Sequence, residues 1–355
     1  MSRQEIYTAS TDELAGKSIV TIGLALKAKE QGRKVGYFKP IGLGSAVSAE
    51  GEIIDQDVVT MKQILGLKHD VNILCPVILG RDEFLEEYQR ADISKCLREI
   101  VESHERASEN KDVVLIEGPP NLSIGSFLGL PVPRLVVEFG AKLLLVSHLE
   151  NDLVADEAIQ VRDYCAKWNV SLLGVVLNRI RKEKMVRVER LIKPLLEANG
   201  IKVLGLVPEN GVLSSLTAGE VYEAIGGEIL AGKDGLDNII ETLLVGAMTT
   251  ESAARYFRKA ANELVITGGD RTDIVFAALE AGASAIVLTG NLRPSVKILP
   301  RADDLRVPII LVPYDTYTTL RMIQKIVGRI EPRDKKRIDI AKKIFDEHVD
   351  WEQIL

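Results

Sequence analysis

Short apolar runs alternate with longer amphipathic segments along the first two hundred residues. The runs are rich in β-branched residues and predict buried strands, at Glu5–Ala9, Val35–Lys39, Val113–Glu117, Lys142–Ser147, Leu172–Asn178 and Val203–Val207. The segments between them predict helices, at Lys17–Gln31, Asp57–Leu65, Glu83–Glu109, Leu153–Trp168 and Lys184–Asn199. This alternation is typical of a parallel sheet that helices cover on both faces. The stretch after Arg81 is long for one strand–helix–strand unit, which indicates an insertion or lid.

The pattern changes after the last of these strands. The turn sequence P-E-N-G at Pro208–Gly211 is followed by a glycine-rich stretch. A second alternating unit then predicts three strands and a helix, at Leu264–Thr267, Ala285–Thr289, Pro308–Val312 and Arg271–Ala281. The remainder, from Thr316 to Leu355, has a helical pattern. We therefore predict an α/β protein with a parallel-sheet domain at residues 1–211, a smaller α/β domain at 212–325 and a helical tail at 326–355.

Composition narrows the classes of function. The chain has 355 residues, of which 46% are apolar and 27% charged, and this suits two globular domains. A net charge of −6 argues against a nucleic-acid partner. No apolar run approaches the roughly eighteen residues of a membrane helix, and no signal peptide is visible, so we expect a cytoplasmic protein without a membrane partner. The three cysteines are far apart and predict buried thiols, not a zinc site.

The loop between the first strand and the first helix carries the chemistry. It ends in Gly16-Lys17-Ser18, which closes a phosphate-binding P-loop, G-x-x-x-x-G-K-[ST]. A helix N-terminus offers unpaired amides to phosphate, Lys17 can reach the β- and γ-phosphates, and the Ser18 hydroxyl can hold Mg²⁺. Thr11 stands at the first glycine position, and because a β-branched residue disfavours positive φ, this turn must differ from the usual one. The alternative is a helix start that happens to read G-K-S.

Three charged residues, two at strand ends and one at the start of a helix, complete the predicted site. Glu117 ends an apolar run at the edge where parallel sheets bind ligands, and with Asp57 and Ser18 it is predicted to hold Mg²⁺. Lys39 ends the second strand and would add positive charge above the phosphates. Each of the three also has a plainer interpretation. Asp57 could cap the helix it begins, Glu117 could be a solvated strand end, and Lys39 could be a surface lysine.

Four segments resemble dethiobiotin synthetases. Ser10–Ser18 (S-T-D-E-L-A-G-K-S) resembles that family's P-loop, G-T-D-T-x-V-G-K-T, and Tyr37–Ile41 resembles its Y-K-P-V. Ile116–Gly118 is similar to its E-G-A-G-G segment, and Leu177–Arg179 to its base-recognising asparagine. The resemblance implies that ATP or GTP binds with Mg²⁺ and that Lys17 and Lys39 are catalytic. The implied nucleotide-binding residues are Thr11, Asp12, Gly16, Lys17, Ser18 and Asn178.

The second domain resembles a DRTGG domain at Val265–Ile274, V-I-T-G-G-D-R-T-D-I. A dethiobiotin-synthetase-like domain followed by a DRTGG domain is the N-terminal arrangement of long phosphotransacetylases, and the resemblance covers roughly residues 4 to 325. The residues themselves predict a strand–turn–helix in which Asp270 caps the helix and Asp273 is a capping-box acid. The alternative is a second site for an anionic effector, at Gly269, Asp270, Arg271 and Thr272.

Departures from these families alter the expected activity. The sequence ends where a phosphotransacetylase begins its acetyltransferase domain, so we expect no acetyl transfer. Leu43 replaces the serine with which dethiobiotin synthetases hold the carbamate, and Ser45 lies two residues further on. Gly118–Asn121 replaces the glycine-rich turn after the carboxylate. We therefore expect a nucleotide-binding protein with a regulatory or sensing role, assembled as a homo-oligomer, most simply a dimer. The alternative is an ATP-dependent ligase for a carboxylate or carbamate, or a slow NTPase.

Overall fold

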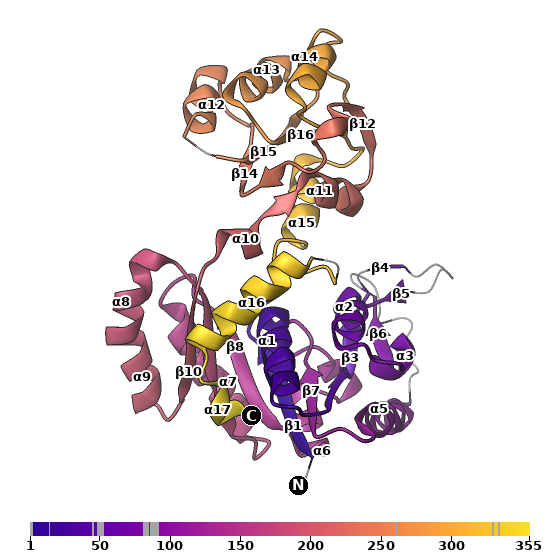
Figure 1. Cartoon of the computed structure of the whole chain (residues 1–355), viewed down its shortest axis with the longest axis vertical. Helices are drawn as coiled ribbons and strands as arrows, with labels where there is room; N and C mark the ends of the chain where they lie inside the picture. The colour runs from indigo at the N-terminus through magenta and orange to yellow at the C-terminus, as the bar shows by residue number, and fades with distance from the viewer. Residues whose placement is uncertain are drawn as a thin grey trace. The chain divides into compact units, whose positions relative to one another are not determined.

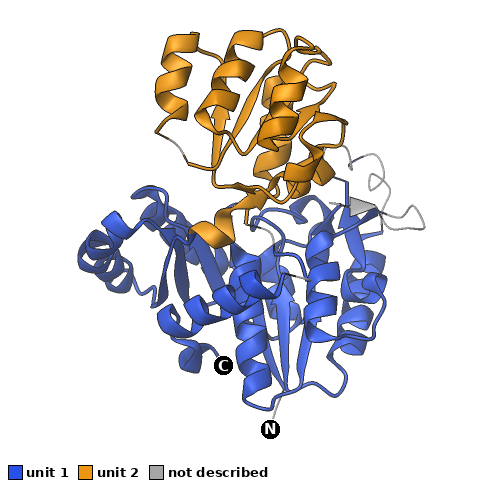
Figure 2. Ribbon diagram, turned by 45° about the horizontal axis from the view of Figure 1, so that its top comes forward, with its two compact units in different colours: residues 1–210, 330–355 blue, residues 211–329 orange. Residues whose placement is uncertain are grey.

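The computed structural model divides the chain into two compact units (Figure 2). Unit 1 comprises residues 1–210 and 330–355, and unit 2 comprises residues 211–329. The structure describes residues 3–13, 15–44, 46–47, 53–80, 85, 92–259, 261–328, 330–332 and 334–355. The helical tail, predicted as a separate segment at 326–355, belongs to unit 1 from Ile330 onward. In the described ranges no helix is both long enough and apolar enough to cross a membrane.

A six-stranded parallel sheet forms the centre of unit 1 (Figure 1). Its strand order is β10-β9-β8-β1-β7-β2, and every neighbouring pair is parallel. The strands are β1 Gln4–Ser10, β2 Val35–Phe38, β7 Val113–Glu117, β8 Lys142–His148, β9 Leu172–Ile180 and β10 Val203–Pro208. All six predicted strands are confirmed. Because the chain leaves β1 toward β2 but leaves β7 toward β8, the two connections run in opposite directions and open the sheet's ligand crevice between β1 and β7.

Helices and short strands surround this sheet. The helices of the first stretch are α1 Lys17–Glu30, α2 Gln56–Leu65, α3 Val71–Leu74, α5 Ile93–Ser108, α6 Val132–Glu138, α7 Leu153–Ala166, α8 Met185–Arg187 and α9 Lys193–Ala198. The short strands are β3 Ile41–Leu43, parallel to β6 Val77–Leu79, and β4 Ala46–Val47, antiparallel to β5 Ile53–Ile54. The short strands and α3 and α6 were not predicted, because runs of two to seven residues show no clear period.

The interpretation of the stretch after Arg81 as a lid is wrong for its described part. Helix α5 begins at Ile93, where the Asp92 side chain accepts hydrogen bonds from the backbone N–H groups of the first turn. The helix packs against β2 and buries one face that includes Ile100 and His104. It is therefore one of the helices that cover the sheet. The remainder of the predicted lid, residues 81–84 and 86–91, lies outside the described residues.

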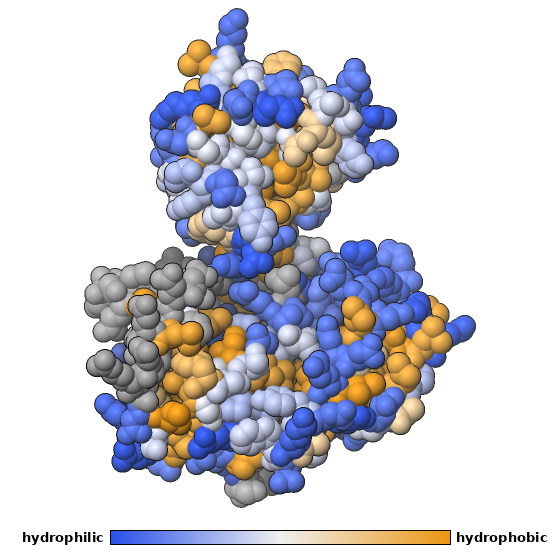
Figure 3. Space-filling model, turned by 180° about the vertical axis from the view of Figure 1, so that it is seen from behind, coloured by the Kyte–Doolittle hydropathy of each residue, from blue (hydrophilic) through white to orange (hydrophobic). Residues whose placement is uncertain are grey.

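The predicted helix at Lys184–Asn199 is not a uniform α-helix. A π-helical turn, Val188–Ile192, separates α8 from α9. Pro194 lies at the start of α9, and because proline has no N–H and its ring crowds the carbonyl four residues earlier, regular α-helical bonding cannot continue through it. Three apolar side chains of this segment, Val186, Leu191 and Leu195, are exposed. Figure 3 shows apolar atoms on the surface of unit 1 at the right of the view.

The C-terminal helices pack along the P-loop helix. Helices α16, Lys335–His348, and α17, Trp351–Ile354, lie against α1 and β10 (Figure 1). The contact is close at Gly23, because a Cβ there would lie 2.3 Å from the ring of buried Phe345. Lys27 of α1 pairs with Asp346 at 3.1 Å and places its ammonium 4.5 Å from the centre of the Trp351 ring. The end of the chain is thus an integral part of unit 1.

Unit 2 is a smaller α/β domain around a five-stranded sheet of order β12-β17-β16-β15-β14, in which only the pairing of β12 is antiparallel. Its strands are β12 Glu228–Ala231, β14 Thr242–Val245, β15 Glu263–Gly268, β16 Ala285–Thr289 and β17 Ile309–Leu311, beside a two-stranded ribbon of β11 Leu216–Thr217 and β13 Ile239–Ile240. Its helices are α10 Gly211–Ser214, α11 Ala218–Ile225, α12 Thr250–Phe257, α13 Thr272–Ala281, α14 Ile298–Leu305 and α15 Thr316–Gln324. Two separate hydrophobic clusters fill the two faces of the sheet, as the alternation of side chains along strands requires.

Candidate functional site

The P-loop joins β1 to α1 as the sequence predicts. Gly16 is the N-cap of α1 and has φ +73°, a conformation that glycine adopts without strain. A Cβ at Gly16 would lie 2.3 Å from Nδ2 of Asn178, so the site also excludes a larger residue by space. Thr11 is not among the described residues with positive φ, and its hydroxyl donates to Asp12 Oδ2 at 3.2 Å. The turn at Thr11 therefore differs from a glycine turn, as expected.

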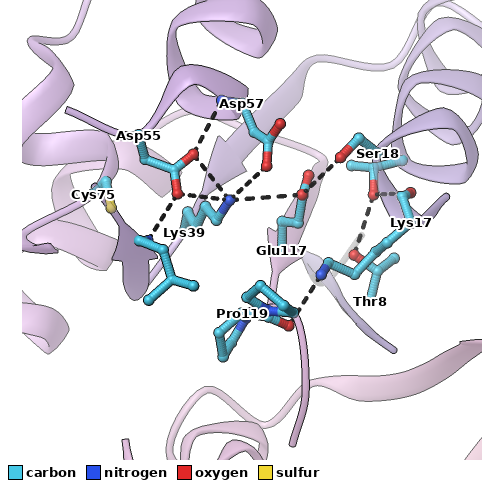
Figure 4. Close-up of polar contacts among 12 residues, drawn as sticks. Thr8, Lys17, Ser18, Lys39, Asp55, Asp57, Cys75, Glu117 and Pro119 are labelled. Atoms are coloured by element: carbon cyan, nitrogen blue, oxygen red, sulfur yellow. Dashed lines mark hydrogen bonds and ion pairs between the residues drawn. The ribbon is translucent and has the colours of Figure 1, made fainter. Parts of the chain in front are cut away.

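Lys17 and Ser18 point toward the end of β7 (Figure 4). The Lys17 ammonium is buried and donates to the Pro119 carbonyl at 3.0 Å and to Ser10 Oγ at 3.3 Å. The Ser18 hydroxyl donates to Glu117 Oε1 at 3.1 Å. Lys17 and Ser18 thus lie at the first turn of α1, where the free amides of a helix N-terminus favour an anion.

Lys39 is surrounded by carboxylates (Figure 4). Its Nζ lies 2.9 Å from Asp55 Oδ2, 2.8 Å from Asp57 Oδ2 and 3.9 Å from Glu117 Oε1. Only 3% of the Lys39 side chain and 4% of the Asp55 side chain are exposed, against 35% of Asp57. Tyr37 donates to Glu117 Oε2 at 3.3 Å from the neighbouring strand. Three acids and one lysine therefore share a small, largely buried volume beside the P-loop.

The plainer interpretations of these three residues do not hold. Glu117 is fully buried and is not a solvated strand end, and Lys39 is not a surface lysine. Asp57 is not the cap of α2, because Asp55 is the N-cap and its Oδ1 accepts from the Asp57 N–H at 3.0 Å. Asp57 lies in the first turn instead, and its Oδ2 accepts a hydrogen bond from Lys39 at 2.8 Å.

For the Glu117, Lys17 and Lys39 side chains, burial and the neighbouring opposite charges change the pKa in opposite directions. Burial raises the pKa of Glu117, against the opposing effect of the Lys39 charge. Burial lowers the pKa of Lys17, and the Glu117 charge opposes that change. Burial would lower the pKa of Lys39 as well, but Asp55, Asp57 and Glu117 together hold it well above its usual value. Lys39 is therefore a firmly protonated ion-pair partner.

Asn178 supports the loop through its side-chain amide. Its Nδ2 donates to the Ala15 carbonyl at 2.8 Å, and its Oδ1 accepts from the Arg179 N–H at 2.9 Å. It lies near the C-terminal end of β9, two strands away from β1, so it reaches the P-loop from the same carboxyl edge of the sheet. Asn178 thus fixes the position of the residue before Gly16, a contact that the sequence did not predict.

The oxygens of Ser18, Asp57 and Glu117 fit a magnesium ion. Mg²⁺ prefers oxygen ligands, keeps several waters and is commonly held by one or two carboxylates together with substrate phosphates. The Ser18 and Glu117 oxygens lie 3.1 Å apart, and Asp57 and Glu117 both approach the Lys39 ammonium. Within the residues that the structure describes, no group of three or more His, Cys, Asp and Glu side chains is arranged to hold a metal by itself. Any metal here would therefore also need the hydroxyl, water and phosphate.

The loop of unit 2 that precedes α13 does not form the cap that the sequence predicts. The N-cap of α13 is Arg271, so Asp270 is not the cap. Asp273 is not a capping-box acid, because it pairs with the Arg271 guanidinium at 3.1 Å and accepts from the Thr250 hydroxyl at 2.6 Å. Arg271 also donates to the Met248 carbonyl. Gly269 is packed tightly, since a Cβ there would collide with the Leu292 carbonyl. The Arg271 side chain is thus already engaged within the loop.

Sequence reasoning missed the role of Asp55. In the sequence, Asp55 is only the first acid of the D-Q-D sequence at Asp55–Asp57, and the predicted metal site uses Asp57. The available signal was the preference for aspartate at the N-cap of a helix, because Asp55 directly precedes the helix that begins at Gln56. Leu43 contributes its backbone instead of a side-chain hydroxyl, since its N–H donates to Asp55 Oδ2 at 3.0 Å. Ser45, the other candidate for the acceptor side, lies outside the described residues.

Comparison with known families agrees with this arrangement. A family model described as the AAA domain matches residues 4–217, more than half of the chain. The chain belongs to this AAA domain family. A second model, described as the DRTGG domain, matches residues 220–326. The AAA domain match covers the main part of unit 1, and the DRTGG match lies within unit 2.

Curated relatives share this order of domains. The chain is 24% identical to the phosphate acetyltransferase of Nitratidesulfovibrio vulgaris and 25% identical to that of Pseudomonas putida, in each case over 98% of this chain and 51% of the relative. It is also 31% identical to the uncharacterised protein YtoI of Bacillus subtilis, over 48% of this chain and 40% of that protein. The chain is thus homologous to the N-terminal region of phosphate acetyltransferases and spans about half the length of those relatives.

Solved structures with partial similarity include proteins of two kinds. The septum site-determining protein MinD of Pyrococcus horikoshii, solved with Mg-ADP, aligns with 60% of this chain and 84% of its own at 20% identity, with a TM-score of 0.39. The CBS and DRTGG domains of the Clostridium perfringens pyrophosphatase regulatory region, solved with the activator diadenosine tetraphosphate, align with 43% of this chain and 74% of their own at 18% identity, with a TM-score of 0.29.

Proposed function

We propose that the protein binds ATP or GTP with Mg²⁺ in unit 1 and has a regulatory or sensing role. The observation that carries this proposal is the placement of Lys17 and Ser18. Both lie at the N-terminus of α1, directly after a glycine in the left-handed conformation, and Ser18 is hydrogen-bonded to the carboxylate that ends β7. The AAA domain match over residues 4–217 supports the same proposal.

Each residue has a distinct proposed task. The α1 amides and Lys17 bind the β- and γ-phosphates, and Lys17 would exchange its bond to the Pro119 carbonyl for a phosphate oxygen. Ser18 would be a direct ligand of Mg²⁺, and Asp57 and Glu117 would support the ion directly or through water. The ion, when bound, would supply positive charge to the phosphates. Thr11, Asp12 and Asn178 are the other proposed nucleotide contacts, with Asn178 proposed to bind the base.

The regulatory part of the proposal rests on unit 2. The DRTGG domain match over residues 220–326 supports a sensing module. The proposed effector loop is Gly269–Thr272. An anion there would have to compete with Asp273 for the Arg271 guanidinium, so the effector must bring at least one strongly charged group.

Calorimetric titration with ATP and GTP, with and without Mg²⁺, tests the nucleotide proposal. We expect Lys17→Ala to weaken binding at least a hundredfold, because it removes the only cation at the helix start that is not paired with a carboxylate in the described residues. Lys29→Ala is the matched control, since Lys29 is an exposed lysine on the same helix. Equal affinity of the Lys17→Ala and Lys29→Ala variants would remove the P-loop assignment.

A second assay separates the regulatory proposal from the ligase alternative. Release of ADP or GDP is measured with Mg²⁺, bicarbonate and diaminopelargonate as acceptor. We expect slow or absent release that the acceptor does not change, because phosphoryl transfer needs an oriented acceptor as well as charge stabilisation. Robust acceptor-dependent release would favour the ligase instead.

A further inference from the structure

The helical segment formed by α8, the π-helical turn and α9 exposes a stripe of apolar side chains. The segment lies beside β10 at one side of unit 1 (Figure 1). The stripe consists of three side chains that are 58%, 56% and 48% exposed, namely Val186, Leu191 and Leu195. The opposite side of the segment is buried against unit 1 through Val188, Ile192 and Leu196. Apolar side chains grouped in this way on a surface commonly mark a site for another molecule.

The π-helical turn brings the three side chains of the stripe toward one side of the segment. The Lys193 N–H donates to the Val188 carbonyl, five residues earlier, so this turn contains one more residue than an α-helical turn. Leu191 and Leu195 are four residues apart and are neighbours by ordinary helical spacing. Val186 is five residues before Leu191, a spacing that would turn it away in a regular α-helix. The wider turn brings it back toward Leu191 and so extends the stripe.

A pocket of about 490 Å³ lies at the N-terminal end of this segment. Its lining includes the buried side chains of Leu149 and Val188 and the exposed side chain of Leu153 at the start of α7. Lys184 also lines the pocket, and its ammonium donates to the Glu150 carbonyl at 2.6 Å. In the part of the chain that the structure describes, Lys184 forms no ion pair with a carboxylate. The pocket therefore combines an apolar interior with a cation that has no acidic partner.

The two ends of the segment carry opposite charges. Three cations and one acid precede α8, namely Arg181, Lys182, Lys184 and Glu183. Near the C-terminal end, Glu197 is exposed and lies 4.0 Å from Lys193, at the outer limit for an ion pair. Lys184 and Glu197 are equally far in sequence from the midpoint between Arg190 and Leu191. Val186 and Leu195 are equally far from the same midpoint. Reversing the direction of the segment therefore exchanges apolar with apolar positions and a cation with an anion.

We propose that this surface binds a second copy of the same chain. In a two-fold contact the same surface of each copy meets its counterpart, so every contact occurs twice. Two segments that cross antiparallel at Leu191 place Leu195 of one copy at the pocket of the other. The same crossing brings Glu197 of one copy to Lys184 of the other.

The second copy fits this surface better than a lipid or nucleic-acid surface does. Those surfaces would attract the cations, but they would repel Glu197 and offer no side chain to the pocket. The proposed contact uses none of the P-loop residues, so it goes beyond the proposed nucleotide function and does not depend on it.

Sedimentation velocity of the full chain over a series of concentrations tests the contact. We expect a reversible monomer–dimer equilibrium, and we expect Leu191→Glu to weaken dimerisation at least tenfold, because it places a charge at the centre of the apolar contact. Val137→Glu is the matched control, since Val137 is a similarly exposed side chain on α6 of the same unit. Circular dichroism checks that both variants are folded. A monomeric unaltered protein, or equal dimerisation of the two variants, would overturn the proposal.

A mixture of two charge-reversal variants tests the two-fold geometry. Lys184→Glu and Glu197→Lys each place like charges opposite one another at both contacts, so we expect each variant alone to dimerise at least fivefold more weakly than the unaltered protein. In an equimolar mixture the heterodimer has complementary charges at both contacts. We expect it to form with an affinity within threefold of that of the unaltered dimer. A mixture that is no more dimeric than the separate variants would show that these side chains do not meet, and it would overturn the proposal.

Discussion

At the scale of single residues, the site depends on positions where only one residue type fits. Gly16 combines a left-handed backbone with a Cβ position that Asn178 already occupies. Glu117 and Lys39 are buried only because each has an oppositely charged partner within reach, since an unpaired buried charge is strongly unfavourable. Sequence patterns predicted Gly16, Lys17, Ser18 and Glu117, because their types and spacing have a local meaning. They could not predict the role of Asp55, because its partner Lys39 lies 16 residues earlier, just after β2.

Gly16→Ala should impair both folding and nucleotide binding. The left-handed conformation costs a residue with a side chain about 1 to 3 kcal/mol, and the new methyl group must displace the Asn178 amide. We expect a lower midpoint in denaturant unfolding and weaker nucleotide binding in calorimetry. Gly32→Ala is a control for backbone strain alone, because Gly32 also has positive φ but has open space around its Cβ position. Equal nucleotide affinity in the Gly16→Ala and Gly32→Ala variants would contradict a special role for Gly16.

Glu263 gives unit 2 a pH-dependent stability. Burial raises the pKa of Glu263 to about 7, and its Oε1 has no hydrogen-bond partner in the structure. A carboxyl with a raised pKa in the folded state binds more protons there than in the unfolded chain, so stability falls as the pH rises from about 4.5 to about 7. The loss is on the order of 1 to 3 kcal/mol.

Glu263→Gln should abolish this part of the pH dependence. The variant cannot ionise, so we expect it to be more stable than the unaltered protein at pH 8 and similar at pH 4.5. Thermal unfolding of unit 2 across that range measures the difference. A parallel pH profile for the two proteins would show that Glu263 does not ionise within the window.

At the scale of elements, the sequence predicted the long regular segments well and the short ones poorly. The six strands of the main sheet are continuous apolar runs, and their pattern alone identifies them. Strands of two or three residues such as β3 and β4 have too few positions to show a period. The sequence pattern predicts a helix in the tail. It does not predict that this helix packs against α1, because nothing in the sequence of α16 indicates that Phe345 contacts Gly23.

Phe345→Ala should destabilise unit 1 substantially. Its ring is buried against α1, and removing a buried phenylalanine typically costs about 3 to 5 kcal/mol. Trp351, which lies over Lys27 next to this contact, reports the loss through its fluorescence. Lys343→Ala on the same helix changes an exposed side chain and should shift the unfolding free energy by less than about 0.5 kcal/mol. Matching destabilisation by the two variants would argue against the packing described for α16.

At the scale of the whole molecule, unit 1 is assembled from two stretches of sequence and unit 2 from one. Unit 2 has its own hydrophobic clusters on both faces of its five-stranded sheet. Unit 1 obtains the cover of α1 and the bridge between Gly205 and Val349 only from the final stretch. The family models match this linear order of an AAA domain and a DRTGG domain, but a linear match does not reveal that the chain returns.

We therefore expect the two units to differ in stability when each is produced as a separate fragment. We expect residues 211–329 to fold alone, with a cooperative unfolding transition. Residues 1–210 without 330–355 should be less stable than unit 1 of the whole chain, because the apolar side of α1 that meets Phe345 is exposed to water. Circular dichroism of both fragments measures this. Addition of a peptide spanning residues 330–355 should restore part of the lost stability to the second fragment.

The return of the chain to unit 1 also determines the order of events during synthesis. The P-loop leaves the ribosome before Phe345 and Trp351, which complete the packing of its helix and emerge more than three hundred residues later. Domains generally fold as units while the chain is being made, so unit 2 can become native while α1 still lacks its cover. A nascent chain would thus hold a finished DRTGG domain beside an unfinished P-loop domain. Competence to bind nucleotide would then report that synthesis has passed α16 and α17.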